Sequence, residues 1–85
     1  MFEVYSKDNC QYCVKAKNLL TNKGEEFTVI DVSAGSIDDQ VLARELLINR
    51  VVETAGITPR TMPQIFRDNE YVGGFDDLDA LLKDD

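Results

Sequence analysis

The chain has 85 residues, of which 44% are hydrophobic and 29% are charged, and its formal net charge is −7. This size fits one domain, residues 1 to 85, with a single small core. The negative charge argues against binding to nucleic acid and to anionic membrane surfaces, since both are bound through basic patches. No N-terminal segment has the pattern of a signal peptide and no apolar run approaches ~18 residues, so we expect a cytoplasmic protein.

The first half of the chain alternates strand and helix patterns. Residues 1 to 6 predict a short strand, and residues 11 to 23 predict a helix that Gly24 ends. Residues 26 to 32 are rich in β-branched side chains and predict a second strand. After a short loop, Ser36 is a suitable N-cap for another helix.

This next helix is predicted from residue 37 to about residue 55, before Gly56. It rests on apolar residues that recur at near-helical spacing: Ile37, Val41, Leu42, Ile48, Val52 and Ala55. The same segment is also compatible with two shorter helices that break near Asn49-Arg50.

The last part of the chain predicts a hairpin and a helix. Residues 64 to 67 and 70 to 73 form the hairpin, which turns at Asp68-Asn69, and residues 75 to 83 form the helix. The order β-α-β-α-β-β-α predicts an α/β protein, with a parallel strand pair joined by a right-handed crossover and two antiparallel strands. Helices would cover both faces of this four-stranded mixed sheet.

The two cysteines of the chain, Cys10 and Cys13, lie where the first strand leads into the first helix. A thiol in the first turn of a helix faces unpaired backbone N–H groups and the positive end of the helix dipole, and both favour the reactive thiolate. Cys10 is therefore the expected nucleophile, and Cys13, further into the helix, is the expected buried resolving thiol. The alternatives are an incidental pair and half of a zinc site, but the chain has no histidine and no second Cys-x-x-Cys to complete four zinc ligands.

Two further segments can bind a ligand through their backbone. Pro63 is either an ordinary trans proline at a strand start or a cis proline that exposes the Met62 backbone to an extended peptide. Gly73-Gly74 either forms a plain turn or brings a ligand carboxylate to the N-terminus of the last helix.

Three side chains near these segments are candidate ligand contacts. Lys7 and Arg60 are basic residues in an acidic chain and can meet a carboxylate, although isolated surface cations often contribute little. Tyr12 lies between the cysteines and either contacts ligand or serves as a capping aromatic.

Together these segments resemble the glutaredoxin family, which has the thioredoxin fold. The matching motifs are residues 7 to 17 around the cysteines, residues 60 to 66 around Pro63, and residues 73 to 78. They cover nearly the whole chain in the right order, which makes the resemblance far more specific than a Cys-x-x-Cys pair alone.

The resemblance implies a glutathione-dependent thiol–disulfide oxidoreductase. Such an enzyme reduces protein disulfides, such as that of ribonucleotide reductase, and removes glutathione from protein thiols. Cys10 would hold the glutathione mixed disulfide, and Cys13 would resolve protein disulfides. The implied cofactor is glutathione, without a metal, and its site would comprise Lys7, Tyr12, Arg60, Thr61, Met62, Pro63, Gly74, Phe75 and Asp76.

Within that implied site each end of glutathione has its own partners. Lys7 and Arg60 would meet the glycine carboxylate, and the Met62 backbone would pair with the cysteinyl amide beside a cis Pro63. The γ-glutamyl end would be received by Gly74, Phe75 and Asp76.

Two departures from the family pattern keep other functions open. Gln11 replaces the proline of the common Cys-Pro-Tyr-Cys form, which should alter the helix start and the redox poise. Residues 33 to 58 look more like those of phage glutaredoxins, which resemble a bridge between glutathione and thioredoxin reductase.

The rivals are a thioredoxin-like enzyme fed by thioredoxin reductase, an iron–sulfur carrier that holds a cluster between two monomers, and a redox-inert interaction module. Cys13 counts against the carrier, which usually has a single active-site cysteine. Nothing in the sequence indicates more than a monomer.

Overall fold

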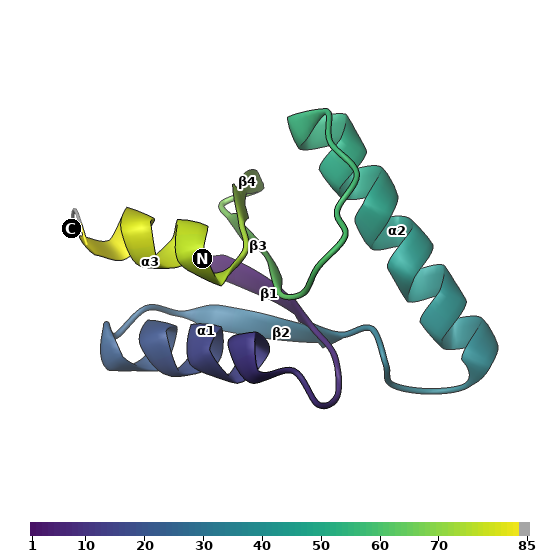
Figure 1. Ribbon diagram of the computed structural model, residues 1–85, viewed down its shortest axis with the longest axis horizontal. Coiled ribbons are helices and arrows are strands. Elements are labelled where there is room, and N and C mark those ends of the chain that lie inside the picture. Colours follow the sequence, from purple (N-terminus) through teal and green to yellow (C-terminus); the bar gives the residue numbers. More distant parts are fainter. Residues whose placement is uncertain (84–85) are drawn as a thin grey trace.

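The computed structural model describes residues 1–83 and contains a four-stranded sheet and three helices (Figure 1). The sheet order is β2-β1-β3-β4; β1 and β2 are parallel, and the other neighbouring pairs are antiparallel. This confirms the predicted β-α-β-α-β-β-α order and mixed sheet. In chain order the elements are β1 (Phe2–Ser6), α1 (Gln11–Asn22), β2 (Phe27–Asp31), α2 (Ile37–Ala55), β3 (Gln64–Arg67), β4 (Glu70–Gly73) and α3 (Phe75–Lys83).

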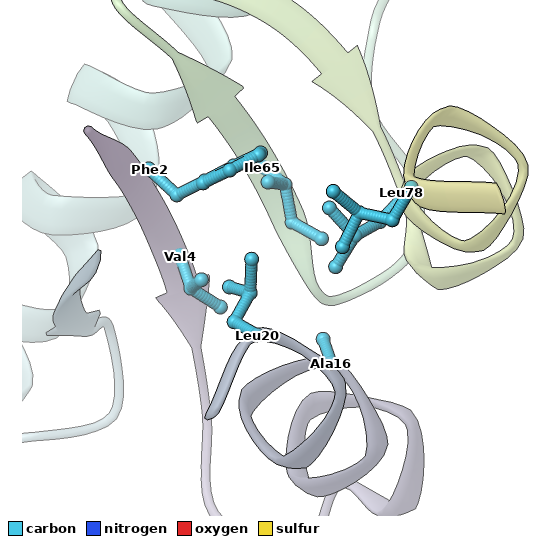
Figure 2. Packing of buried hydrophobic residues seen from close by; sticks show 7 residues of the cluster. Phe2, Val4, Ala16, Leu20, Ile65 and Leu78 are labelled. Carbon is cyan, nitrogen blue, oxygen red and sulfur yellow. The ribbon is translucent and has the colours of Figure 1, made fainter. Parts of the chain in front are cut away.

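Helices cover both faces of the sheet, as predicted. One face packs against α1 and α3 through a core of seven buried residues: Phe2, Val4, Ala16, Leu20, Ile65, Leu78 and Leu82. The six of them that Figure 2 labels point toward one another. The other face packs against α2 through a second cluster: Val32, Leu47, Val51 and Phe66. Successive strand side chains point to opposite faces, so Ile65 belongs to the first cluster and Phe66 to the second.

The segment after the second strand forms one continuous helix, so the alternative of two helices with a break near Asn49-Arg50 is wrong. Ser36 and Asp39 form a reciprocal capping box at the start of α2, and Gly56 ends it in the left-handed conformation with φ 70°. No helix within residues 1–83 combines the length and the apolar content that crossing a bilayer requires.

The apolar residues that predicted α2 lie mostly on its exposed sides. Ile37, Val41 and Val52 are exposed, whereas Leu47 and Val51 are the residues that α2 buries against the sheet. The periodicity therefore predicted the helix correctly but did not indicate which of its faces meets the core.

The hairpin turns at the predicted residues. Asp68 and Asn69 both have positive φ, 49° and 69°, and Arg67 pairs with Glu70 across the turn. Two consecutive residues with positive φ match the twist of antiparallel strands, and Asp and Asn tolerate this conformation better than most residues do.

Arg50 joins α2 to the sheet at the point where the sequence allowed a break. Its guanidinium donates hydrogen bonds to both carboxylate oxygens of Glu3, at 2.8 and 3.1 Å, and to the Tyr5 hydroxyl at 2.9 Å. A further bond reaches Asn69 at 3.2 Å, and the guanidinium carbon lies 3.9 Å from the centre of the Phe66 ring. The hydrogen bonds from Arg50 hold the pKa of Glu3 below its ordinary value.

We expect Arg50→Met to lower the free energy of unfolding at pH 7 by about 1–3 kcal/mol, because it removes charge-assisted hydrogen bonds and a cation–π contact. At pH values above the ordinary pKa of Glu3, the ion pair contributes fully to the free energy of unfolding. This contribution is lost as the pH falls through the lower pKa that Glu3 has in the folded state. Urea denaturation at pH 7 and in acid measures both effects.

Arg44→Met is the matched control, since Arg44 is an exposed arginine on the same helix. We expect that change to stay within about 0.5 kcal/mol of the wild type. Equal losses in the two variants would contradict the assigned role of Arg50.

Candidate active site

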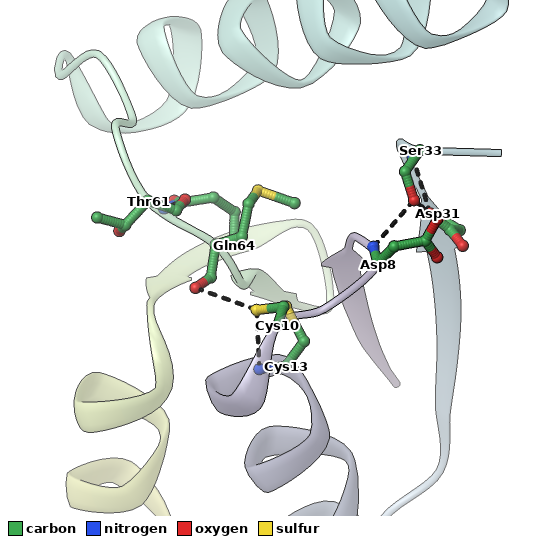
Figure 3. Close-up of a disulfide and its surroundings, with 8 residues drawn as sticks. Asp8, Cys10, Cys13, Asp31, Ser33, Thr61 and Gln64 are labelled. Carbon is green, nitrogen blue, oxygen red and sulfur yellow. Dashed lines mark hydrogen bonds between the residues drawn. A yellow bond between two sulfur atoms is a disulfide. The ribbon is translucent and has the colours of Figure 1, made fainter.

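Cys10 is the N-cap residue of α1. Its backbone is extended, with φ −118° and ψ 103°, and its Sγ atom accepts a hydrogen bond from the Cys13 N–H at 3.2 Å (Figure 3). The first turn of α1, which the structure describes in full, contains no acidic residue that would oppose a negative charge there. The amide and the positive end of the helix dipole therefore stabilise Cys10 as a thiolate when the pair is reduced.

Cys10 and Cys13 form a disulfide, with their Cα atoms 5.3 Å apart. Cys13 is 1% exposed, whereas Cys10 is only half-buried. The buried position expected for Cys13 is thus confirmed. An incoming disulfide can reach Cys10 from solvent, and Cys13 is placed to attack the Cys10 sulfur once that sulfur is part of a mixed disulfide.

Met62 lies beside the reactive sulfur. Its carbonyl oxygen is 3.7 Å from Cys10 Sγ, and the Met62–Pro63 peptide is cis, the form that the resemblance implied. The disulfide sulfur has no proton, so this contact becomes a hydrogen bond only when Cys10 is a protonated thiol. Strand β3 begins directly after Pro63, which attaches this end of the loop to the centre of the sheet.

Two adjoining cavities contain the nine residues of the implied glutathione site. The larger has a volume of about 390 Å³ and is lined by residues from the α1 start, the loop before β3 and the α3 start, including Tyr12, Thr61, Met62, Pro63, Gly74, Phe75 and Asp76. The smaller, of about 170 Å³, is lined by Lys7 and Arg60 together with Thr61 and Met62. Thr61 and Met62 line both cavities, so the structure brings the two groups of residues together.

Cys10 itself opens into a third hollow of about 560 Å³, which also contains Lys7. Lys7 therefore borders both the reactive sulfur and the smaller of the two ligand cavities. Two lysines, Lys7 and Lys17, and two aspartates, Asp8 and Asp31, line this hollow, so the positive charge of Lys7 acts locally beside the sulfur.

Two aromatic rings flank the larger cavity. Tyr12 and Phe75 come from the starts of α1 and α3, and their ring centres are 6.1 Å apart. Tyr12 is 53% exposed, and Lys15 Nζ lies 5.0 Å from the centre of its ring. The tyrosine is thus a side wall of the cavity and not a core residue.

The start of α3 is shaped by a close approach of backbone and side chain. The Gly74 N–H donates to Asp77 Oδ2 at 3.1 Å, and Gly73 has φ 123° in a place where a Cβ atom would collide with the Asp77 carboxylate. The Gly74 amide is therefore already engaged, and a ligand carboxylate would meet the first-turn amides of Phe75 and Asp76, for which the helix provides no acceptor.

Behind the cavities lies a chain of two hydrogen bonds, here called the polar relay, which the sequence analysis did not predict. The Tyr71 hydroxyl donates to Gln64 Oε1, and Gln64 Nε2 donates to the Thr61 carbonyl at 2.8 Å. Gln64 is only 3% exposed. Burial and the charge of Asp77 raise the pKa of Tyr71, which keeps its hydroxyl protonated as a donor. The relay fixes the loop that carries Thr61 and Met62, and it depends on a diagonal contact across the hairpin that no local motif reveals.

We expect Tyr71→Phe to lower the free energy of unfolding by about 1–2 kcal/mol, because it leaves the buried Gln64 carbonyl oxygen without a donor. Urea denaturation measures the change. Tyr12→Phe provides the control: this tyrosine lines the same cavity but is exposed, so its loss should cost less than about 0.5 kcal/mol. Indistinguishable stabilities for Tyr71→Phe and the wild type would mean that the relay contributes nothing.

Comparison with known proteins identifies the same family from sequence and from structure. The sequence model of the glutaredoxin family matches residues 2–72. Glutaredoxin 3 of Escherichia coli K12 is 42% identical over 79 residues, which cover 93% of this chain and 82% of that protein. The glutaredoxin of Enterobacteria phage T4 is 41% identical over 91 residues, covering 98% of this chain and 100% of the phage protein.

Solved structures agree with these relatives. A wheat glutaredoxin is similar with a TM-score of 0.76 and 34% identity, and the alignment covers 98% of this chain and 69% of the wheat chain. A buckwheat glutaredoxin–glutathione complex has a TM-score of 0.77 and 26% identity, with 98% and 68% of the two chains covered. The likeness confirms the thioredoxin fold.

Proposed function

The chain belongs to the glutaredoxin family of thiol–disulfide oxidoreductases, and from this premise we propose that it uses glutathione to reduce protein disulfides and glutathione mixed disulfides. The observation that carries the proposal is the position of Met62. Met62 borders two cavities, one lined by three basic side chains and the other at a helix N-terminus, and its carbonyl lies 3.7 Å from Cys10 Sγ. Glutathione has a thiol between two carboxylate ends, so its shape and charges suit this arrangement.

Each part of the site has a role in holding glutathione as a substrate. Lys7 and Arg60 attract the glycine carboxylate, and the Met62 backbone pairs with the cysteinyl residue. The first-turn amides of α3, at Phe75 and Asp76, receive the γ-glutamyl carboxylate. These contacts orient the glutathione sulfur toward Cys10, so that exchange between the two sulfurs occurs within a bound complex.

Reduction of a protein disulfide begins at Cys10. Its thiolate attacks one substrate sulfur, forms a mixed disulfide and releases the other substrate sulfur as a thiolate. Cys13, once deprotonated, attacks the Cys10 sulfur, which releases the second substrate thiolate and leaves the Cys10–Cys13 disulfide. Two glutathione thiols then restore both cysteines and end as glutathione disulfide. In total one substrate disulfide is reduced and two glutathione molecules are oxidised.

Glutathionylated substrates need Cys10 alone. The Cys10 thiolate takes the glutathionyl sulfur, which frees the substrate thiol, and a second glutathione then reduces Cys10. Proteins that carry a disulfide, such as ribonucleotide reductase, are partners for the route that uses both cysteines. The cytoplasm suits this chemistry, because a reducing compartment keeps a Cys-x-x-Cys pair available for catalysis.

The two cysteine variants separate these routes. We expect Cys13→Ser to keep the reduction of a small glutathione mixed disulfide but to lower protein disulfide reduction about a hundredfold or more, because the resolving thiol is gone. Cys10→Ser should lose both activities. Consumption of NADPH in the presence of glutathione and glutathione reductase gives both rates. Activity that survives in Cys10→Ser would show that the roles are assigned wrongly.

The identity of the reductant is tested by comparing two reducing systems. With a small glutathione mixed disulfide as substrate, we expect NADPH consumption with glutathione and glutathione reductase, and only background consumption with thioredoxin reductase alone. The reason is that Lys7, Arg60 and the α3 amides offer binding to a small anion-bearing thiol. Turnover with thioredoxin reductase alone would instead assign a thioredoxin-like role.

A further inference from the structure

An apolar stripe runs along an exposed flank of α2, next to the residues that the helix buries against the sheet. Ile37, Val41, Ile48 and Val52 are 77%, 50%, 38% and 44% exposed, and their spacings of four, seven and four residues place them on one helical face. We call these four residues the α2 stripe. Figure 1 shows that much of α2 extends beyond the sheet. Exposed apolar side chains grouped on one helical face are typical of interaction sites.

The α2 stripe is joined to a concentration of positive charge. Arg44 lies on the same helical face, between Val41 and Ile48 in the sequence. Arg44, Ile48, Lys7 and Arg60 line the cavity of about 170 Å³, and none of its lining residues, all within the described part of the chain, is acidic. Three of the nine basic residues of a chain with net charge −7 thus gather at one place.

This cationic cavity is continuous with the active site. Thr61 and Met62 line it as well, and the Met62 carbonyl is 3.7 Å from Cys10 Sγ. A glutathione carboxylate held by Lys7 and Arg60 would leave Arg44 and the α2 stripe without a role. A polypeptide whose disulfide meets Cys10 is longer, and its flanking residues can extend over this surface.

We propose that the α2 stripe and Arg44 form the docking surface for the protein substrate, and that the preferred partner is a segment with carboxylate and apolar side chains next to its disulfide. The inference rests on the proposed reduction of protein disulfides. Charge complementarity favours such a partner over a second copy of this chain. A two-fold dimer through the stripe would set the same patch against itself and bring the cations of both copies together.

The test is a single-turnover reaction of the pre-reduced protein with two synthetic peptides. Both carry one intramolecular disulfide and the same leucines, but one has glutamates and the other lysines at the flanking positions. The Cys10–Cys13 dithiol becomes a disulfide as the peptide disulfide becomes a dithiol, so the step needs no glutathione. Acid quenching and chromatography of the peptides give the rate constants.

We expect the wild type to reduce the acidic peptide about tenfold faster than the basic one at low salt, with the ratio falling as salt is added. Arg44→Glu should bring the ratio close to one. Lys23→Glu makes the same charge change on an exposed residue at the far end of α1 and should leave the ratio unchanged. Equal rates for the two peptides with the wild type, or an unchanged ratio in Arg44→Glu, would overturn the inference.

The contribution of the α2 stripe is tested by Val41→Ser. This change should slow the reduction of both peptides severalfold, because both contain the leucines that would pack on the stripe. Leu46→Ser is the matched control, since Leu46 is 60% exposed on another side of α2 and its substitution should change the rates little.

Sedimentation of the wild type is the second measurement: a dimer that Val41→Ser dissociates would assign the stripe to a second copy and overturn the proposal. Failure to reduce either peptide, with folded protein, would instead overturn the proposed function itself.

Discussion

The position of α2 on the sheet sets where the loop before β3 begins, and Arg50 is the polar side chain that ties this helix to the sheet. Beyond the apolar contacts of Leu47 and Val51, the guanidinium of Arg50 reaches Glu3 and Tyr5 on the central strand β1. The loop of residues 56 to 63 leaves the end of α2 and returns to β3. Its residues Arg60, Thr61 and Met62 therefore depend on where α2 is anchored. A partly buried guanidinium suits this role, since its planar fork binds a carboxylate at two points and stacks on a ring.

Although the chain is acidic overall, backbone amides and a few basic side chains surround the reactive sulfur and provide positive charge there. The N-termini of α1 and α3 both point into the site, one at Cys10 and the other at the cavity beside Phe75. Lys7, Arg44 and Arg60 supply the side-chain charge on the opposite side of Met62. The chain as a whole has a net charge of −7, so these three basic residues are a local departure from its overall charge.

The sequence was most informative where structure depends on neighbouring residues. The capping serine before α2, the hairpin turn at Asp68-Asn69 and the cysteine pair at the start of α1 all lie where local patterns predicted them. The same reasoning was weakest for α2. Periodicity predicted its length, yet it allowed a break at Arg50 and drew on apolar residues that the fold leaves exposed.

Local sequence thus determined the elements, their order, the family and the residues of the candidate site, because caps, turns and strand patterns arise from interactions within a few positions of each other. Only the tertiary structure decided which face of α2 is buried, that Tyr71 and Gln64 support the loop before β3, and that Arg44 joins Lys7 and Arg60 around one cavity. These features arise from contacts between residues far apart in the chain. Such contacts depend on how helices and strands pack together, which no short window of sequence encodes.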